Sequence, residues 1–265
     1  MTIKKSLLVL FFCLIRITPL LAQEHLKSAE SIALGNTSFS GGLCVFSSKS
    51  CFSNTFEIQL HHRNLFTKSE LNSFSLECLF PNPNMTTAIG ISTFGYRHYR
   101  ENTFSMALSK RIGQKFALGV ITQFQTLYYT DCTKIAKNIN VSLDAYFNIH
   151  HKDFIYTKFQ HFFPLNTTYN KENLLVLGIH SQSSLSSSWI MEIKTLDFQP
   201  PSIHIGFEYL VKHFAFRLGG YGLPIRPSYG VGFLKGRWTI NMTADWLINI
   251  GHSFCCDIIL KLNKK

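Results

Sequence analysis

The chain has 265 residues, of which 46% are hydrophobic and 14% aromatic, while only 15% are charged. Its formal net charge is +11, from 26 basic and 15 acidic residues. A soluble domain typically carries about 25% charged residues, so this composition excludes a disordered chain, and no Gly-X-Y or heptad period indicates collagen or a coiled coil.

The first 22 residues have the layout of a secretory signal peptide. Lys4 and Lys5 form a positively charged region, Leu7 to Ile15 form an apolar core, and Ala22 is a small residue at the expected cleavage site. A membrane-spanning helix needs about 20 apolar residues, and this stretch is shorter. We therefore expect an exported protein with a signal peptide over 1–22, followed by an irregular stretch over 23–54.

Period-two alternation of apolar and polar residues begins at Thr55 and continues almost to the C-terminal end. Side chains at positions i and i+2 of a strand share one face, so this alternation predicts half-buried strands. No amphipathic helix follows the signal peptide, and the sheet should therefore be antiparallel. The predicted strands are fourteen segments: 55–62, 72–80, 86–95, 102–110, 115–126, 139–148, 153–162, 174–181, 187–197, 203–211, 213–220, 228–236, 237–249 and 252–262.

Two architectures can bury or cover the apolar faces of these strands. A soluble β-sandwich would turn them into a core, whereas a transmembrane β-barrel would turn them toward lipid. The strand lengths are close to the 9–11 residues that cross an outer membrane, and the predicted number is even. Aromatic residues gather near strand ends, as Tyr128 and Tyr129 do. The longer predicted connections tend to alternate with short basic turns; they are 80–83, 131–138, 164–173 and 199–201. These features favour an antiparallel barrel.

Four stretches resemble a known family of such barrels. Residues 31–38 (SIALGNTS) resemble the entry segment of barrels similar to the long-chain fatty-acid transporter. Residues 94–102 (FGYRHYREN), the basic turn in 109–120 and the final hairpin within 229–253 resemble barrels of the same superfamily that are associated with type IX secretion. The resemblance implies an outer-membrane barrel of fourteen strands, with a short N-terminal plug. We therefore expect the plug-like segment over 23–54 and the β-barrel over 55–265.

The alternation also assigns faces. If the apolar positions of 203–211 face lipid, as the cost of charge at the bilayer midplane requires, then the polar positions between them face the lumen. The same argument applies to 139–148 and 237–249. The expected lumen-facing residues are Asp144, His204, Glu208, Asn241 and Asp245.

Other reactive residues give weaker patterns. Adjacent histidines such as His61 and His62 point to opposite faces of a strand, so they do not predict a metal site. Cys44 and Cys51 are close enough in sequence for a disulfide within the plug, whereas Cys255 and Cys256 are expected to be free thiols. No nucleophile elbow, P-loop or dinucleotide fingerprint is present, and the basic residues are scattered through turns. We therefore expect neither an enzyme nor a cofactor, and no nucleic-acid partner.

Two classes of function follow. The first is a non-enzymatic outer-membrane barrel, either a passive conduit for hydrophobic solutes or a component of type IX protein secretion. Its expected partners are outer-membrane lipids, and either hydrophobic small molecules or secretion-machinery proteins. The alternative is a cell-surface binding or structural protein, such as a soluble β-sandwich adhesin.

Overall fold

The computed structural model describes residues 27–38, 47–68, 70–129, 132–150, 153–165, 173–197, 199–222, 224–247 and 250–263. The predicted signal peptide over 1–22 lies outside these residues, and so does part of the predicted plug-like segment over 23–54. Both assignments therefore stay predictions.

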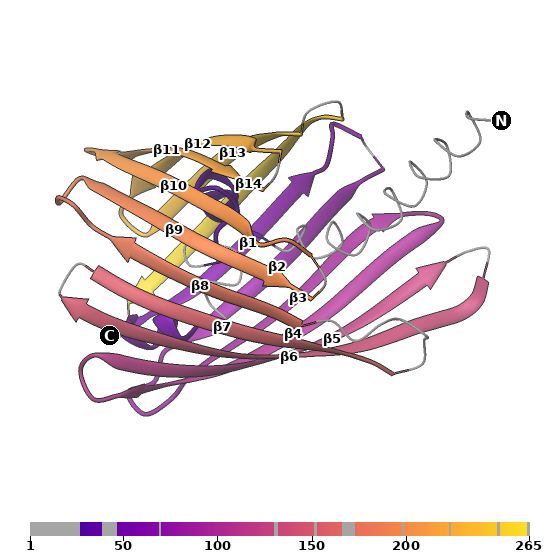
Figure 1. The fold of residues 1–265 in the computed structure, drawn as a ribbon, viewed down its shortest axis with the longest axis horizontal. Helices are drawn as coiled ribbons and strands as arrows, with labels where there is room; N and C mark the ends of the chain where they lie inside the picture. The colour runs from indigo at the N-terminus through magenta and orange to yellow at the C-terminus, as the bar shows by residue number, and fades with distance from the viewer. Residues whose placement is uncertain are drawn as a thin grey trace.

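The described chain forms one closed antiparallel barrel (Figure 1). Each strand pairs with its neighbours in sequence, and β1 pairs with β14 to close the sheet. The strands are β1 (Thr55–Asn64), β2 (Asn72–Phe80), β3 (Thr86–Tyr96), β4 (Tyr99–Ile112), β5 (Phe116–Tyr129), β6 (Cys132–His150), β7 (Asp153–Pro164), β8 (Asn173–Ser181), β9 (Ser187–Leu196), β10 (Ser202–Val211), β11 (Phe214–Tyr221), β12 (Arg226–Lys235), β13 (Trp238–Leu247) and β14 (Gly251–Asn263).

The predicted barrel of fourteen antiparallel strands is confirmed, and each predicted segment overlaps one observed strand. The soluble sandwich is wrong, because one sheet closes on itself and leaves its apolar side chains on the outside. Ile205 and Phe207 are 54% and 46% exposed, whereas His204, which precedes Ile205 on the same strand, is 5% exposed. An exposed apolar belt on a closed barrel is stable only where lipid covers it.

Acidic side chains on the strands point almost entirely into the barrel, as the polar side chain of His204 does. Every described strand carboxylate except that of Asp153, at the start of β7, occupies an inward position of the alternation. These inward acids are Glu57, Glu77, Glu101, Asp144, Glu192, Glu208, Asp245 and Asp257. The inside of the barrel therefore carries nearly all of the described strand carboxylates, which a bilayer would reject.

The connections differ from the sequence prediction in two places. We predicted a long connection over 131–138, but β6 begins at Cys132 and pairs there with the end of β5. The predicted long connection at Phe80–Pro83 lies at the same barrel end as the short basic turn after β4, because β2 and β4 run in the same direction. The predicted alternation of long and short connections is thus only partly present.

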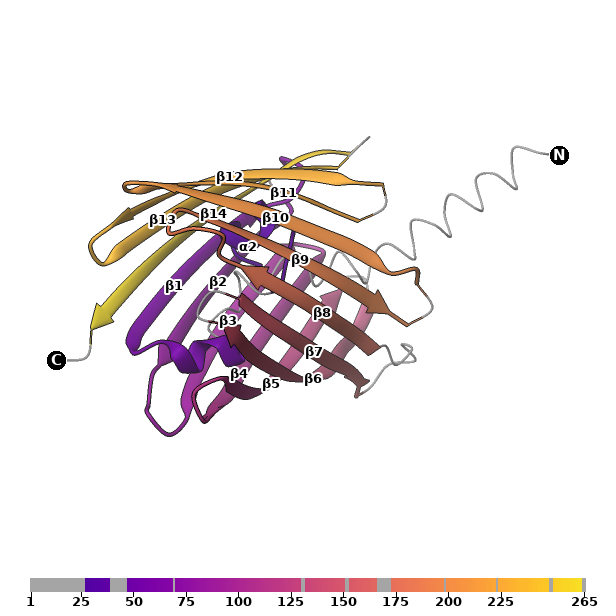
Figure 2. The same ribbon diagram turned by 60° about the vertical axis from the view of Figure 1, so that its left-hand side comes forward.

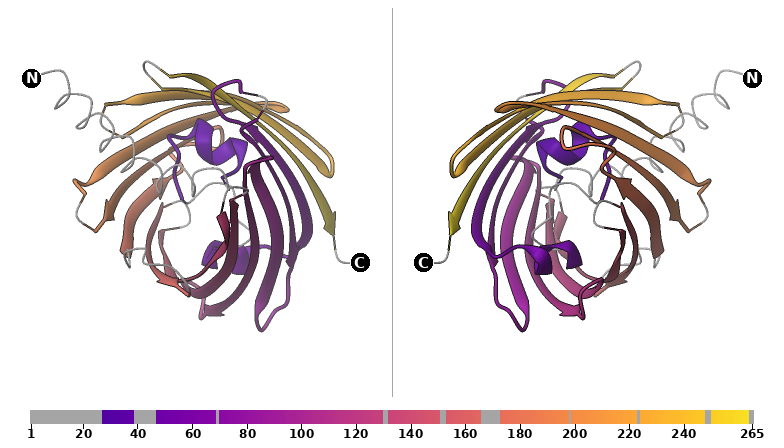
Figure 3. Two further views of the ribbon diagram at one scale, coloured as in Figure 1. Left: turned by 90° about the vertical axis from the view of Figure 1, so that its right-hand side faces the viewer. Right: turned by 90° about the vertical axis from the view of Figure 1, so that its left-hand side faces the viewer.

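The N-terminal segment forms two short helices. The helix α2 (Ala29–Ala33) begins after Ser28, whose side chain accepts a hydrogen bond from the Ser31 amide. The 3₁₀ helix η2 (Ser48–Phe52) follows Ser47, which caps it in the same way through the Lys49 amide. Figures 2 and 3 show α2 enclosed by the strands, close to the wall that leads from β11 to β14. None of the described helices is long and apolar enough to cross a membrane.

Candidate functional site: the lumen and its N-terminal plug

Residues 27–38, which we call the plug segment, are anchored to the last three strands by hydrogen bonds. The amide of Ala29 donates to the Asp257 carboxylate on β14 at 2.6 Å. Thr243 on β13 donates to the Ala29 carbonyl at 2.7 Å, and Ser228 on β12 donates to the Ala33 carbonyl at 3.3 Å. Because α2 is only five residues long, these side chains supply partners for backbone groups that a short helix leaves unpaired.

The turn after α2 is held by two other strands. The Lys194 ammonium on β9 donates to the Asn36 carbonyl at 2.5 Å, and Nδ1 of His204 on β10 lies 2.8 Å from the Gly35 carbonyl oxygen. Glu192 accepts from the Ser38 amide at 2.5 Å. Gly35 and Asn36 both have positive φ angles, of 76° and 58°, which the chain needs to reverse direction here.

Three glycines on neighbouring strands form a recess for the plug segment. A Cβ atom on Gly206 of β10 would lie 2.5 Å from the Leu34 carbonyl oxygen, and one on Gly230 of β12 would lie 2.7 Å from the Ala33 Cβ. Gly219 lies on β11, between these two strands, and the backbone of Gly35 packs directly against it. Glycine inside a strand usually weakens it, and here its absence of a side chain permits backbone to approach the wall.

A charged cluster lies beside α2. The Arg217 guanidinium donates to Glu208 at 2.7 Å and to the Asn241 side-chain oxygen at 2.9 Å. It also lies 3.7 Å from the Glu30 carboxylate of the plug segment. Burial raises the pKa of Glu30 above its ordinary value of 4.5, while the neighbouring Arg217 acts in the opposite direction.

A second buried chain of polar groups connects the plug segment to β1 and β2. Nδ1 of His61 lies 2.8 Å from Asp257, the acceptor of the Ala29 amide, and Nε2 of His61 lies 3.7 Å from Glu77. All three side chains are buried. The Asp257 carboxylate on β14 therefore connects the N-terminus of α2 to His61 on β1, across the seam where the two strands meet.

The helix η2 contacts a different part of the inner wall. The Ser48 amide donates to Asp144 on β6 at 2.5 Å, and the Phe52 ring lies 5.5 Å from the Tyr146 ring. The Arg111 guanidinium lies 4.9 Å from the centre of the Phe52 ring, within cation–π range. Burial raises the pKa of the Cys51 thiol to about 11.

An inner apolar patch lies on β5 to β9, beneath these contacts. It contains Ala117, Tyr146, Tyr156, Val176 and Ile190, all buried, and Leu34 of the plug segment packs into it. Phe52 of η2 and Phe154 border the same patch. The N-terminal segment thus covers apolar wall on one side and polar wall on the other.

The structure places the five residues that we expected in the lumen as follows. His204 contacts the plug segment, Glu208 and Asn241 contact Arg217, and Asp144 contacts η2. Asp245 accepts from the Tyr221 hydroxyl at 2.8 Å and lies 3.6 Å from Arg63. Four of the five thus lie near α2 and the wall that holds it, whereas Asp144 belongs to the η2 contact.

Sequence reasoning missed Glu192, Lys194, Arg217 and Asp257, although each lies at an inward position of an alternating strand. The alternation of apolar and polar residues that assigned Glu208 to the lumen could also have assigned these four residues. Cys44, the expected disulfide partner of Cys51, lies outside the described residues, so that pairing stays a prediction. Among the described residues, no group of three or more His, Cys, Asp or Glu side chains could hold a metal ion.

The comparison with known proteins rests on structure. The chain is similar to the Ralstonia pickettii toluene transporter TbuX, with a TM-score of 0.63 and 10% identity over 90% of this chain and 98% of that one. It is also similar to the Pseudomonas putida toluene transporter TodX, with a TM-score of 0.60 and 10% identity over 89% and 98%. The monoaromatic hydrocarbon channel CymD gives a TM-score of 0.63, with 9% identity over 90% and 97%.

No protein-family model matches the sequence, and no curated protein matches it significantly. The shared architecture is that of outer-membrane channels. The predicted barrel class is thereby confirmed, whereas the resemblance to fatty-acid transporters and to type IX barrels stays a resemblance. Identities near 10% establish a common fold, and the ligand has to be argued from the residues of this chain.

Proposed function

We propose that this protein is a passive outer-membrane channel for hydrophobic small molecules. The observation that carries the proposal is the inner apolar patch covered by Leu34. If the plug segment moves away from it, Val176, Ile190 and Tyr156 become available to a solute that gains free energy by leaving water. The three structural neighbours carry toluene or other monoaromatic hydrocarbons by name, which supports the same class of ligand.

The contacts that hold the plug segment are weak enough individually to be replaced by hydrogen bonds to water. Most of them are hydrogen bonds between backbone groups of the plug segment and wall side chains, which contribute about 0.5–1.5 kcal/mol each, or about 1.5–3 kcal/mol where the partner is charged. No catalytic arrangement is needed for passage. No observation on the described residues favours the secretion role over the conduit.

The proposal is tested by solute uptake. Cells that lack the gene should take up radiolabelled toluene more slowly than cells that carry it, with no change for glycerol, a polar solute of similar mass. The protein secretion pattern should be the same in both strains. Unchanged toluene uptake would overturn the conduit, and loss of secreted proteins with normal uptake would favour the secretion role.

A matched pair of variants connects uptake to the patch. Val176→Asp places a carboxylate in the inner apolar patch and should lower toluene uptake. Ser142→Asp places the same group at another buried inward position, on β6 and outside the patch, and should leave uptake closer to the wild type. Heat-modifiable migration in gels shows whether each variant has assembled.

A further inference from the structure

Two neighbouring hairpin turns at one barrel end carry exposed basic residues. One turn joins β10 to β11 and the other joins β12 to β13, and each contains two residues. The Leu234 amide donates to the His213 carbonyl at 2.7 Å, so the two turns lie side by side. Lys212, Lys235 and Arg237 are all exposed there. We call residues 211–214 and 234–238 the basic turn pair.

Aromatic side chains cover the outer surface beside the basic turn pair. The ring centres of Phe214 and Phe233 lie 5.4 Å apart, and the ring centre of Phe216 lies 6.5 Å from that of Phe214. Trp238 pairs with Lys235 across its turn and is 52% exposed. In outer-membrane barrels, aromatic rings gather at the two interfaces between hydrocarbon and headgroups. The basic turn pair therefore lies at a membrane interface.

The connections between strands assign the basic turn pair to the periplasmic end of the barrel. At this end β1 begins and β14 ends. The two longest connections, between β1 and β2 and between β7 and β8, lie at the other end. Bacterial barrels have short periplasmic turns and longer extracellular loops. The exposed bases therefore face the headgroups of the periplasmic leaflet.

The charge of the outer surface around the basic turn pair has one sign. The strands β10 to β14 contain three acidic residues, and each accepts a hydrogen bond inside the barrel. They are Glu208, Asp245 and Asp257. Among the described residues of these strands, no carboxylate therefore shares the outer face with the exposed bases. An anionic group at the bilayer surface is attracted to each such base.

Lys212 occupies a position that favours glycine. Its φ angle is 53°, and Gly236, at the equivalent place in the neighbouring turn, has a φ angle of 61°. Both are the first residue of a two-residue hairpin turn. A side chain is disfavoured at positive φ, and turns of this kind usually have Gly or Asn there. A lysine at this strained position indicates a role for its side chain.

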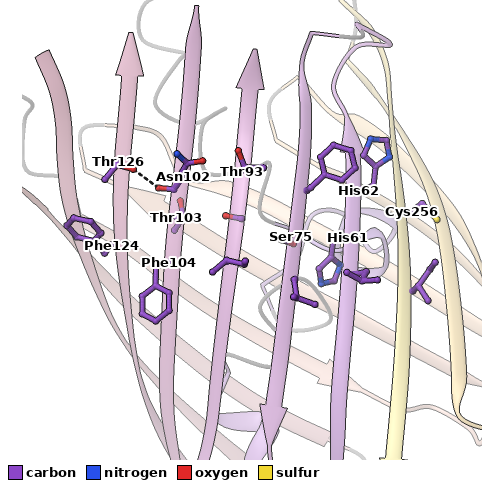
Figure 4. Close-up of a pocket in the computed structure, with 16 residues that line it drawn as sticks. His61, His62, Ser75, Thr93, Asn102, Thr103, Phe104, Phe124, Thr126 and Cys256 are labelled. Atoms are coloured by element: carbon purple, nitrogen blue, oxygen red, sulfur yellow. Dashed lines mark hydrogen bonds between the residues drawn. The ribbon is translucent and has the colours of Figure 1, made fainter. Parts of the chain in front are cut away.

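A large groove elsewhere on the outer surface lacks such charges. It has a volume of about 740 Å³, crosses β14 and β1 to β5, and is lined by aromatic residues such as Phe104 and Phe124 (Figure 4). Among the described residues that line it, none is Lys, Arg, Asp or Glu. The groove offers apolar surface to an acyl chain but no lysine or arginine to a phosphate.

We propose that the basic turn pair binds an anionic phospholipid of the periplasmic leaflet. The headgroup phosphate lies beside Lys212, Lys235 and Arg237, and an acyl chain packs along Phe214 and Trp238. Bases at the barrel end and aromatic rings toward the midplane match the order of headgroup and chain in a leaflet. The site does not depend on the proposed transport function, because these side chains are exposed outside the lumen.

Native mass spectrometry of the full detergent-solubilised chain tests the site. The protein is titrated with phosphatidylglycerol and with phosphatidylcholine that carry the same acyl chains, and phosphatidylglycerol should bind more tightly. Lys235→Gln should weaken that binding about fivefold, the factor that corresponds to the loss of one charge near an anionic headgroup. Equal binding of the two lipids, or an unchanged affinity in Lys235→Gln, would overturn the proposal.

Lys212→Gly separates the charge from the stability of the turn. The change removes the base and supplies the residue that the backbone favours at a φ angle of 53°. The affinity for phosphatidylglycerol should fall about fivefold, whereas the midpoint of urea unfolding should not fall. A Lys212→Gly chain that binds the lipid as tightly as the wild type would refute the role of Lys212 and the proposal with it.

Two control variants leave the basic turn pair intact and should bind phosphatidylglycerol as the wild type does. Lys110→Gln removes an exposed base at the same barrel end, on β4. An equal loss of affinity in this variant would mean that only the total charge matters. Thr93→Trp fills the groove of Figure 4, and a loss there would place the lipid in that groove. Either loss would contradict the proposed site.

A soluble anion distinguishes a lipid site from a phosphate site. Excess glycerol phosphate should not displace the bound phosphatidylglycerol, because it has no acyl chain to pack along the aromatic rings. Displacement would identify a site for free anions and overturn the proposal. Heat-modifiable migration shows that each variant is folded.

Discussion

Gly219 on β11 lies directly against the backbone of Gly35 in the plug segment, so that a Cβ atom on Gly219 would collide with the Gly35 amide nitrogen. The contact joins two backbones, and neither has a flexible side chain that could move aside. The fit of the plug segment in the barrel therefore depends on the absence of a single methyl group.

Gly219→Ala should displace the plug segment while the barrel still assembles, because the clash lies on the inner surface and the strand hydrogen bonds do not change. Single-channel conductance in planar bilayers should rise. Gly220→Ala is the control on the adjacent residue, where a Cβ would find its nearest neighbour at an ordinary 3.4 Å. Equal conductance in both variants would show that the recess does not hold the plug.

Asp257→Ala should lower the free energy of unfolding by about 1.5–3 kcal/mol, the contribution of a hydrogen bond to a charged group. The change removes the acceptor of the Ala29 amide and leaves His61 without its partner at 2.8 Å. Urea titration followed by tryptophan fluorescence measures the loss. Asp153→Asn alters an only partly buried carboxylate at the start of β7 and should cost less. A similar loss there would contradict the assigned role of Asp257.

Single cysteines introduced into a cysteine-free chain should report the two faces of β10. Cysteine at Ile205 or at Phe207 should react with a lipid-soluble maleimide, because both side chains are about half exposed on the outer surface. Cysteine at His204 should not react, since that position is buried against the Gly35 carbonyl. If the cysteine at His204 reacted and those at Ile205 and Phe207 did not, the assignment of the inner and outer faces of β10 would be reversed.

The thiol of Cys51 should react slowly with iodoacetamide in the reduced protein. Its pKa is raised to about 11 by burial, so the thiolate becomes the major form only above that pH. At pH 8 alkylation should be roughly 100-fold slower than for a thiol with a pKa of 9, and the rate should keep rising above pH 9. A rate that levels off near pH 9 would show that the thiol is exposed.

The strand alternation alone predicts that Glu208→Gln leaves assembly unaffected, because Glu208 lies on the lumen face. The hydrogen bond from Arg217 to Glu208 at 2.7 Å changes that expectation, because Arg217 is buried and shares its guanidinium with Asn241 and Glu30. Unpairing a buried cation is costly, so Glu208→Gln should now destabilise the barrel. Urea titration against wild type measures this, and equal stability would restore the original expectation.

The strands were predictable from the sequence because lipid on one side and polar lumen on the other impose a strict period of two. In β10 the exposure of the side chains alternates from Ile203 to Val211, and the sequence alternates with it up to Tyr209, whereas Leu210 is apolar at an inward position. The prediction failed for the first part of β6, where Cys132 to Asn138 pair with the end of β5 without a regular apolar alternation. Pairing that continues beyond the apolar layer leaves no hydrophobic pattern in the sequence.

The plug contacts could not be predicted in the same way. Gly206, Gly219 and Gly230 were recognisable as glycines within strands, which indicates a close approach of some backbone. The sequence does not say which backbone, because the contacts join residues 28–38 to residues more than 150 positions away. Only the closed topology brings them together.

The bond between the Ala29 amide and Asp257 spans 228 residues. Thr243 and Ser228, the other anchors of α2, also lie in the last strands. During synthesis the plug segment therefore leaves the ribosome long before its binding surface exists, and it has to wait for β12 to β14. Contacts of such large sequence separation form slowly. A chain truncated before β14 could pair its earlier strands but would have no Asp257 to receive the helix, so a docked plug marks a barrel that has been completed.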